Sequence, residues 1–179
     1  MPTVRELSAN ARRDRCTLGR REILATIHSI FVYGTLKQFQ LRAPIWPRKP
    51  TSIQPAVIRA ALYDTGPFPA ILVGDDWVLG ELWTLAINDM PTTLDVLDEV
   101  EGFSPNRDDN LYVRIVKDAT LEDGTVIRTF TYQYASNEQG SSMRRIEPFA
   151  SFAGYNCAAW PDRFSQVPKN LADEERFKI

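Results

Sequence analysis

The segment Leu94–Glu101 (LDVLDEVE) combines four acidic side chains with apolar ones at helical spacing. On a helix, Leu94, Leu97 and Val100 share one face, which we expect to pack on the core. Glu101 follows Leu97 by four positions, so it alone among the four acids is carried towards the interior. Partial burial and the negative end of the helix dipole should raise the pKa of this carboxyl, which suits a general acid or base near neutral pH. The alternative is that all four acids form a solvated face, the usual meaning of a charge run.

A second candidate is the turn Tyr33-Gly34-Thr35-Leu36, which directly follows the apolar run Ile30–Val32. The β-branched and aromatic residues of that run favour a strand. Glycine lets a ligand approach the backbone closely, and the N–H groups of such a turn can bind a carboxylate or stabilise an oxyanion. The alternative is a buried sheet edge that binds nothing.

Local signals place a helix around the acidic segment. Asn88 or Asp89 can cap its start, and Pro91 suits its first turn. Gly102 is placed to end it, because glycine readily adopts the left-handed conformation that follows a helix. Glu101 should therefore stand at the C-terminal end of this helix.

Most of the other signals are strand signals. The stretch 38–54 is rich in proline and basic residues, so we expect a loop there, with room for a short helix. Gly80 suggests a bulge or a tight barrel bend, and Glu122-Asp123-Gly124 marks a hairpin turn. This order favours an α+β fold, with a mixed sheet closing towards a small barrel, over a doubly wound parallel sheet. The expected strands are Ile30–Tyr33, Ala56–Gly66, the stretch after the GPFP bend, Trp77–Leu85 and the two arms of the hairpin.

The chain divides into three expected parts. Residues 1–28 are arginine-rich but also contain Glu6, Asp14 and Glu22, which break the acid-poor pattern of a transit peptide. We therefore expect an N-terminal extension, with a transit peptide or a basic arm as the alternatives. Residues 29–136 should form the folded domain, and residues 137–179 a helix and coil extension that packs on it.

Composition limits the partners. The 179 residues are 44% hydrophobic and 25% charged, with a formal net charge of −2, so there is no electrostatic case for nucleic acid or an acidic membrane. No apolar run approaches the roughly 20 residues of a membrane span, and no signal peptide is recognisable. Cys16 and Cys157 lie far apart and form no metal-spaced pair, so a reducing compartment is the simplest interpretation. We expect a cytoplasmic protein, monomeric or homodimeric, that acts on a small molecule.

Several kinds of catalysis find no support. His28 is the single histidine and should lie at the surface, which argues against histidine triads and histidine-rich metal sites. The sequence has no P-loop, no dinucleotide-binding glycine motif and no G-x-S-x-G motif. Carboxylate chemistry without a metal or a cofactor remains.

Other side chains have open interpretations. Tyr132 and Tyr134 alternate with small and polar residues, so they share one strand face. They either pack in the core or place one phenol in a pocket. Arg114 is either an ion-pair partner at the surface or a site residue. We expect the four tryptophans to lie in the core or in an interface.

Three of these segments together resemble the gamma-glutamylcyclotransferase-like superfamily, which includes the AIG2-like proteins. The YGTL turn at positions 33–36 is similar to that family's substrate loop. Residues 97–114 look like its "LD…EGY…YxR" segment, although Phe103 stands where tyrosine is common. GPFPAIL, which lies between these two segments, resembles the proline-containing start of a strand in that family. The resemblance covers about residues 30–135.

The resemblance implies a small mixed β-barrel with flanking helices. It also implies a reaction without a cofactor, in which a γ-glutamyl compound cyclises to 5-oxoproline and releases an amine or an amino acid. Glu101 matches the catalytic glutamate, and the YGTL turn matches the loop that holds the γ-glutamyl end. The residues assigned to substrate binding are Tyr33, Gly34, Thr35, Leu36, Tyr112 and Tyr134.

Three hypotheses follow. In the first, Glu101 moves protons while the α-amine of a γ-glutamyl substrate attacks the γ-carbonyl. In the second, the fold is a non-catalytic module that binds a small γ-glutamyl-like or acidic ligand. In the third, the same scaffold transfers acyl groups or forms amides. The sequence leaves the departing amine open, since its specificity should depend on the loops 38–54 and 104–110 and on the C-terminal tail.

Overall fold

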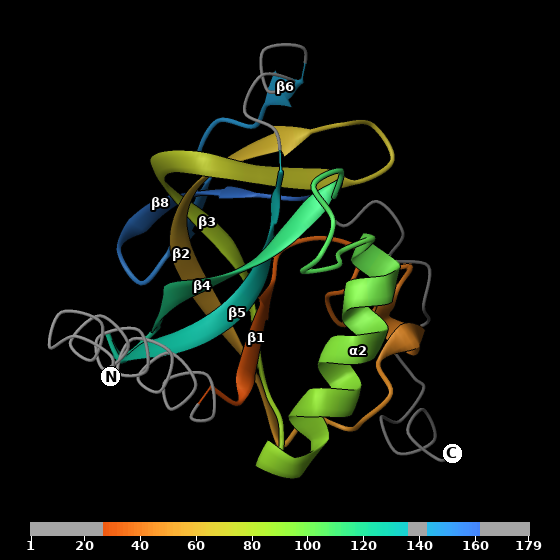
Figure 1. Cartoon of the computed structure of the whole chain (residues 1–179). Coiled ribbons are helices and arrows are strands. Elements are labelled where there is room, and N and C mark those ends of the chain that lie inside the picture. The colour runs from red at the N-terminus through yellow and green to blue at the C-terminus, as the bar shows by residue number, and fades with distance from the viewer. Residues whose placement is uncertain (1–26, 136–142, 162–179) are drawn as a thin grey trace, which may run out of the picture.

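A computed structural model describes residues 27–135 and 143–161. Its elements form a strand-rich domain with one α-helix among these residues (Figure 1). In chain order they are β1 (Ser29–Val32), η1 (Ala43–Ile45), β2 (Ser52–Asp64), β3 (Pro69–Thr84), η2 (Ile87–Asp89), α2 (Met90–Glu101), β4 (Tyr112–Leu121), β5 (Val126–Tyr134), β6 (Arg144–Arg145), β7 (Ala150–Phe152) and β8 (Tyr155–Ala159).

Five strands close into a barrel. They are hydrogen-bonded in the order β2-β4-β5-β1-β3, and a pairing between β2 and β3 closes the ring. β1 runs parallel to β5 and antiparallel to β3, so the sheet is mixed. The α+β barrel predicted from the sequence is confirmed. Closure gives the backbone groups of these strands partners on both sides, which a flat sheet of five strands would leave exposed at its edges.

β1 contributes to both cores of the domain because its side chains alternate. Ile30 and Val32 belong to an apolar cluster that also contains Leu97 of α2. Phe31 and the following Tyr33 belong to a second cluster, built mainly from β2 and β3. The strand is fully buried on both faces. The turn after it is therefore held from two sides.

β3 is one strand of 16 residues where we expected two, one in the stretch after the GPFP bend and one at Trp77–Leu85. Its register against β2 shifts between Ala60 and Ala61, which pair with Asp76 and Leu72 and leave three residues of β3 in a bulge. Gly80 keeps its regular pairing with Ala56, so of the two alternatives expected at Gly80, a bulge or a tight barrel bend, the bulge is wrong. A Cβ at Gly80 would lie 2.3 Å from the carbonyl oxygen of Val32, so glycine is needed for the close approach of β1.

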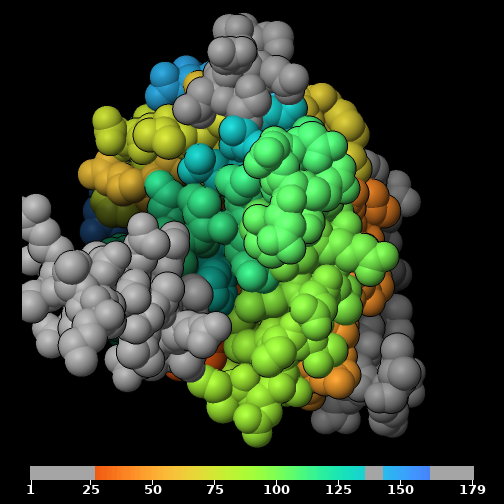
Figure 2. All heavy atoms as spheres, in the orientation of Figure 1, coloured from red at the N-terminus to blue at the C-terminus, as the bar shows by residue number. Residues whose placement is uncertain are grey.

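Helix α2 begins and ends where the sequence predicts. Its C-cap is Gly102, with a left-handed φ of 66°, and Glu101 is its last residue. The N-cap is Asp89, whose side chain makes no capping hydrogen bond. The buried face is Met90, Thr93 and Leu97, so it is rotated away from the Val100 position that we expected to be in the core. Figure 1 shows the helix along one side of the barrel, and in Figure 2 the helix and the segment after it cover that side.

Residues 143–161 differ from the helix and coil that we expected for the C-terminal extension. Residues 143–161 form strands, of which β8 pairs in parallel with β3 at residues 77–79 and β7 pairs with β8. The physical reason is that β1 ends at its pairing with Glu81, so the same edge of β3 is open for another strand beyond that point. Cys157 and Trp160 are buried there. The segments 1–26, 136–142 and 162–179 lie outside the described residues, and with them most of the expected N-terminal extension.

Three of the tryptophans are buried in the core, as expected. Trp46, which follows η1, stacks on Trp83 of β3 at a centroid distance of 4.2 Å. Its indole N–H also donates a hydrogen bond to the carbonyl oxygen of Leu36 (3.0 Å). This residue therefore fastens the loop after β1 both to the barrel and to the turn at positions 33–36.

Candidate active site

The turn after β1 leaves its backbone N–H groups available. The carbonyl oxygens of Gly34, Thr35 and Leu36 accept hydrogen bonds from the Lys37 amide (3.1 Å), the Arg42 amide (2.8 Å) and the Trp46 indole. No hydrogen bond from the amide N–H of Gly34, Thr35 or Leu36 to another described residue is present. All three residues are buried. Because buried backbone N–H groups are almost always paired, a cluster of open ones at a pocket wall is suited to hold an anionic ligand.

Gly34 is required by packing within the protein. A Cβ at this position would lie 2.3 Å from Cγ of Pro69, the first residue of β3. The sequence suggested that glycine lets a ligand approach the backbone, but the structure gives it this additional reason. The contact also sets the turn against the start of β3, where Pro69 forms part of the same pocket.

Glu101 faces this turn across the pocket. Its side chain is 11% exposed, and burial raises the pKa of its carboxyl to about 7, while the nearby Arg42 opposes the rise. The raised pKa predicted from the sequence is therefore confirmed, with burial as its main cause. A carboxyl with this pKa is present in both protonation states near neutral pH, so it can both accept and donate a proton.

Tyrosine hydroxyls form rigid parts of the wall. The Tyr33 hydroxyl donates to the carbonyl oxygen of Tyr132 (2.8 Å), and the Tyr112 hydroxyl donates to that of Pro69 (2.9 Å). Burial raises the pKa of both phenols, so they remain neutral. Each hydroxyl is thus fixed by a backbone partner and cannot take up the role of a proton acceptor by ionising.

The two tyrosines of β5, Tyr132 and Tyr134, differ in their positions relative to the pocket. Tyr132 lines the pocket, whereas Tyr134, which we had assigned to substrate binding, is not among the lining residues. Tyr134 packs edge-on against the ring of Tyr112 at a centroid distance of 5.4 Å. It therefore supports a lining residue from behind. Of the two phenols on this strand face, the one that lines the pocket is Tyr132.

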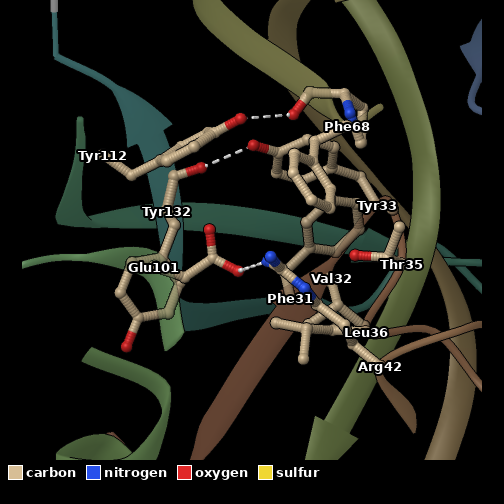
Figure 3. A pocket seen from close by; sticks show the side chains of 12 residues that line it. Phe31, Val32, Tyr33, Thr35, Leu36, Arg42, Phe68, Glu101, Tyr112 and Tyr132 are labelled. Carbon is tan, nitrogen blue, oxygen red and sulfur yellow. Dashed lines mark hydrogen bonds and ion pairs between the residues drawn. The ribbon is translucent and has the colours of Figure 1, made fainter. Parts of the chain in front are cut away.

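Arg42 lines the pocket, although the sequence did not single it out. It precedes η1, and its guanidinium lies over the Phe68 ring (4.1 Å) and 3.7 Å from the Glu101 carboxylate (Figure 3). Phe68 comes from the GPFPAIL stretch, whose family resemblance pointed to this region without giving it a role. Nothing in the spacing of the loop distinguishes Arg42 from Arg48, which pairs with Asp89 and does not line the pocket.

The free space of the pocket, counted together with the open solvent at its mouth, is about 400 Å³. The pocket brings together the predicted Glu101, Tyr112 and the entire turn 33–36. The full set of lining residues is Phe31, Val32, Tyr33, Gly34, Thr35, Leu36, Arg42, Phe68, Pro69, Glu101, Tyr112 and Tyr132. The loop 104–110, expected to contribute to specificity, does not line it.

Asp98 contradicts one expectation. We expected it to point away from the interior, but its carboxylate accepts a hydrogen bond from the Tyr132 hydroxyl (2.6 Å) and forms an ion pair with Arg114 (2.7 Å). Burial raises the pKa of this carboxyl, against the opposing effect of these two partners. The cluster joins α2 to β4 and β5. Arg114 is therefore an ion-pair partner that holds the helix in place.

The described residues contain no cluster of His, Cys, Asp and Glu side chains that could hold a metal ion. His28 is exposed, as expected. None of the described helices is long and apolar enough to cross a membrane. The charged side chains that line the pocket are the Glu101 carboxyl and the Arg42 guanidinium.

The described residues form a small, closed mixed barrel with one α-helix packed on it. The sequence pattern of the family described as gamma-glutamyl cyclotransferase, AIG2-like, matches residues 30–150. The chain belongs to this family. A search of curated proteins finds no match.

Solved structures with a similar arrangement are distant in sequence. YkqA from Bacillus subtilis is 16% identical, with a TM-score of 0.47 over 66% of this chain, and the match spans 37% of YkqA. An uncharacterised protein from Pyrococcus horikoshii is 17% identical, with a TM-score of 0.44 over 66% of this chain and 84% of its own. A gamma-glutamyl cyclotransferase is 18% identical, with a TM-score of 0.44 over 65% of this chain and 68% of its own.

Proposed function

We propose that this protein cyclises a γ-glutamyl amine or γ-glutamyl amino acid to 5-oxoproline and releases the amine. The observation that carries the proposal is one pocket in which a buried carboxyl with a pKa of about 7 faces a turn with open N–H groups. Family membership supports the same class of reaction. Glu101 is the proposed general acid and base, and Tyr33–Leu36 is the proposed binding turn.

The chemistry needs only these groups. Ionised Glu101 accepts a proton from the α-ammonium of the substrate, which frees the nitrogen lone pair. The nitrogen attacks the γ-carbonyl carbon, a five-membered ring forms, and the γ-carbonyl oxygen becomes negative. Glu101 then gives the proton to the departing nitrogen as the old C–N bond breaks. The ring nitrogen, which still carries two hydrogens, passes one of them to the released amine through the regenerated carboxylate, so the products are 5-oxoproline with a neutral lactam N–H and an ammonium ion. No water is consumed, and the carboxylate is regenerated.

The turn has a defined part in this scheme. The N–H groups of Gly34, Thr35 and Leu36 bind the negative oxygens of the γ-glutamyl part, which are the α-carboxylate in the ground state and the γ-oxyanion in the transition state. Nucleophile and electrophile belong to one molecule, so the main task of the protein is to hold a folded conformer. The fixed hydroxyls of Tyr33 and Tyr112 keep the wall of that conformer's site rigid.

The test is 5-oxoproline release from a panel of γ-glutamyl amino acids, γ-glutamylamines and glutathione. We expect turnover with at least one compound and a roughly 10²- to 10⁴-fold loss of kcat/KM in Glu101→Gln. Glu99→Gln is the matched control, because Glu99 lies on the exposed side of the same helix. If a folded Glu101→Gln variant is as active as the wild type, the role of Glu101 is wrong.

The panel also separates this proposal from the second hypothesis. A protein that binds γ-glutamyl compounds in equilibrium measurements but releases no 5-oxoproline from any of them would be a binding module. The charge pair of Glu101 and Arg42 in the pocket is the observation that keeps this alternative open, because opposite charges also suit binding without turnover.

A further inference from the structure

Arg42 is held in place by its backbone and its neighbours. Its amide N–H donates to the carbonyl oxygen of Thr35 (2.8 Å), which ties the residue to the binding turn. A few residues further on, Trp46 fastens the same loop to the barrel through Trp83. The side chain thus reaches the pocket from a fixed frame, and 25% of it is exposed.

The guanidinium of Arg42 has unused donors. Its face lies on the Phe68 ring, a contact that leaves the N–H groups at its edge open. The approach to Glu101 is 3.7 Å, which is longer than the roughly 2.7–3.2 Å of an N–H···O hydrogen bond. Among the described residues, no side-chain hydrogen bond of Arg42 is present. A planar fork of five donors at a pocket wall matches a carboxylate that is not part of the protein.

The position of Arg42 indicates which carboxylate this is. In the proposed function the turn 33–36 already binds the oxygens of the γ-glutamyl part. Glu101 must reach the departing nitrogen to protonate it, and Arg42 lies beside Glu101. When the departing group is an α-amino acid, its carboxylate is attached one carbon away from that nitrogen. The carboxylate of such a group therefore falls within reach of Arg42.

We infer that Arg42 selects substrates whose departing amine carries an α-carboxylate, so that γ-glutamyl-α-amino acids are preferred over γ-glutamylamines. This inference rests on the proposed function and adds a specificity residue to it. Two other roles of Arg42 are conceivable: it could bind the α-carboxylate of the γ-glutamyl part, or it could only adjust the pKa of Glu101. Both would affect the two substrate classes equally.

γ-Glutamylalanine and γ-glutamylethylamine form a matched pair, because they differ only by the carboxylate on the departing group. The measured quantity is the ratio of their kcat/KM values, in which any common effect on Glu101 cancels. We expect the wild type to prefer γ-glutamylalanine by roughly 10- to 100-fold, the range of a charge-assisted hydrogen-bond pair. Arg42→Gln should bring the ratio close to one, and Arg42→Lys should leave it in between.

Arg48→Gln is the control, since it makes the same change in the same loop outside the pocket, and it should keep the wild-type ratio. If Arg42→Gln lowers kcat/KM for both substrates by the same factor, Arg42 does not recognise the departing group and the inference is wrong. A wild type without preference for γ-glutamylalanine would overturn it as well.

Equilibrium binding separates failure of this inference from failure of the proposed function. If wild type releases no 5-oxoproline from either compound, the proposed function fails, and calorimetric titration with both compounds then tests Arg42 alone. Tighter binding of γ-glutamylalanine that is lost in Arg42→Gln would support the inference. Equal binding of the two compounds, an unchanged preference in the variant, or no binding of either would contradict it.

Discussion

Asp98 and Glu101 are two carboxylates three residues apart on α2, and their surroundings differ. Asp98 is held by Tyr132 and Arg114 at 2.6 and 2.7 Å, whereas the partner of Glu101 among the described residues is Arg42, at 3.7 Å. Burial raises the pKa of both. A buried carboxylate with a hydrogen bond to each of its oxygens stabilises the fold, and one with a single distant partner remains available for a substrate.

Activity should show the largest difference between the two acids. Glu101→Gln removes the proposed proton carrier, so we expect kcat/KM to fall by roughly 10²- to 10⁴-fold. Asp98→Asn keeps an oxygen for the Tyr132 hydroxyl and weakens only the contact that fixes the helix. We therefore expect kcat/KM to fall by about tenfold. Steady-state 5-oxoproline assays measure both. Equal losses would mean that the two carboxylates act as one unit.

Stability should change in opposite directions for the two acids, and for Glu101 the change should depend on pH. The pKa of Glu101 is about 7 in the folded protein, against about 4.5 in the unfolded chain. The folded state thus binds this proton more tightly, and the residue increasingly destabilises the fold as pH rises from about 4.5 to 7. The full cost is about 3 kcal/mol, so Glu101→Gln should unfold at higher urea concentration above pH 7.

The control is to compare the stability of wild type and Glu101→Gln at pH 4. Glu101 is then mostly protonated in both states, and the free energies of unfolding of wild type and Glu101→Gln should agree to within about 0.3 kcal/mol. A stability gain of equal size at pH 4 and pH 8 would show that packing, not ionisation, explains it.

Asp98→Ala should destabilise the fold by about 1–3 kcal/mol, because it leaves the Tyr132 hydroxyl and Arg114 without their shared acceptor. Urea denaturation at pH 7.5 measures the change. Asp95→Ala is the matched control, since Asp95 is an exposed acid on the same helix. If the two variants are equally stable, the Asp98 cluster does not secure the helix.

The smallest expected effect is a shift in the pH profile. Arg42 favours the ionised form of Glu101, so its removal should raise the pKa of that carboxyl above about 7. The lower limb of kcat/KM for γ-glutamylethylamine should therefore move to higher pH in Arg42→Gln. Arg114→Gln, which removes the partner of Asp98, should leave the limb in place. If the lower limb does not move in Arg42→Gln, Arg42 does not influence the pKa of the titrating group.

Local patterns explain what could be foreseen. Pro91 near the start of α2 and Gly102 after it are adjacent in sequence to the residues that they position, so the helix and the place of Glu101 at its end were predictable. The hairpin at Glu122-Asp123-Gly124 was predictable for the same reason, and its Thr125 amide indeed donates to the Asp123 carboxylate (2.8 Å). The turn 33–36 was recognised through its order relative to Glu101.

Other features depend on partners that are distant in the chain. Arg42 enters the site only because Phe68 and Glu101 converge on it, and Asp98 is structural only because Tyr132 and Arg114 reach it from two strands. The strand β8 forms because β1 stops short on the edge of β3. No spacing within one segment encodes these contacts.

By itself, the sequence determined the strand-rich α+β class, the ends of the helix and the pair of motifs that carry the candidate chemistry, because each depends on nearby residues. The tertiary structure alone decided which of two similar acids remains open to a ligand, which arginine faces it and which tyrosine of β5 lines the pocket. These choices depend on burial and on long-range hydrogen bonds, and both arise only when the barrel closes and the helix packs on it.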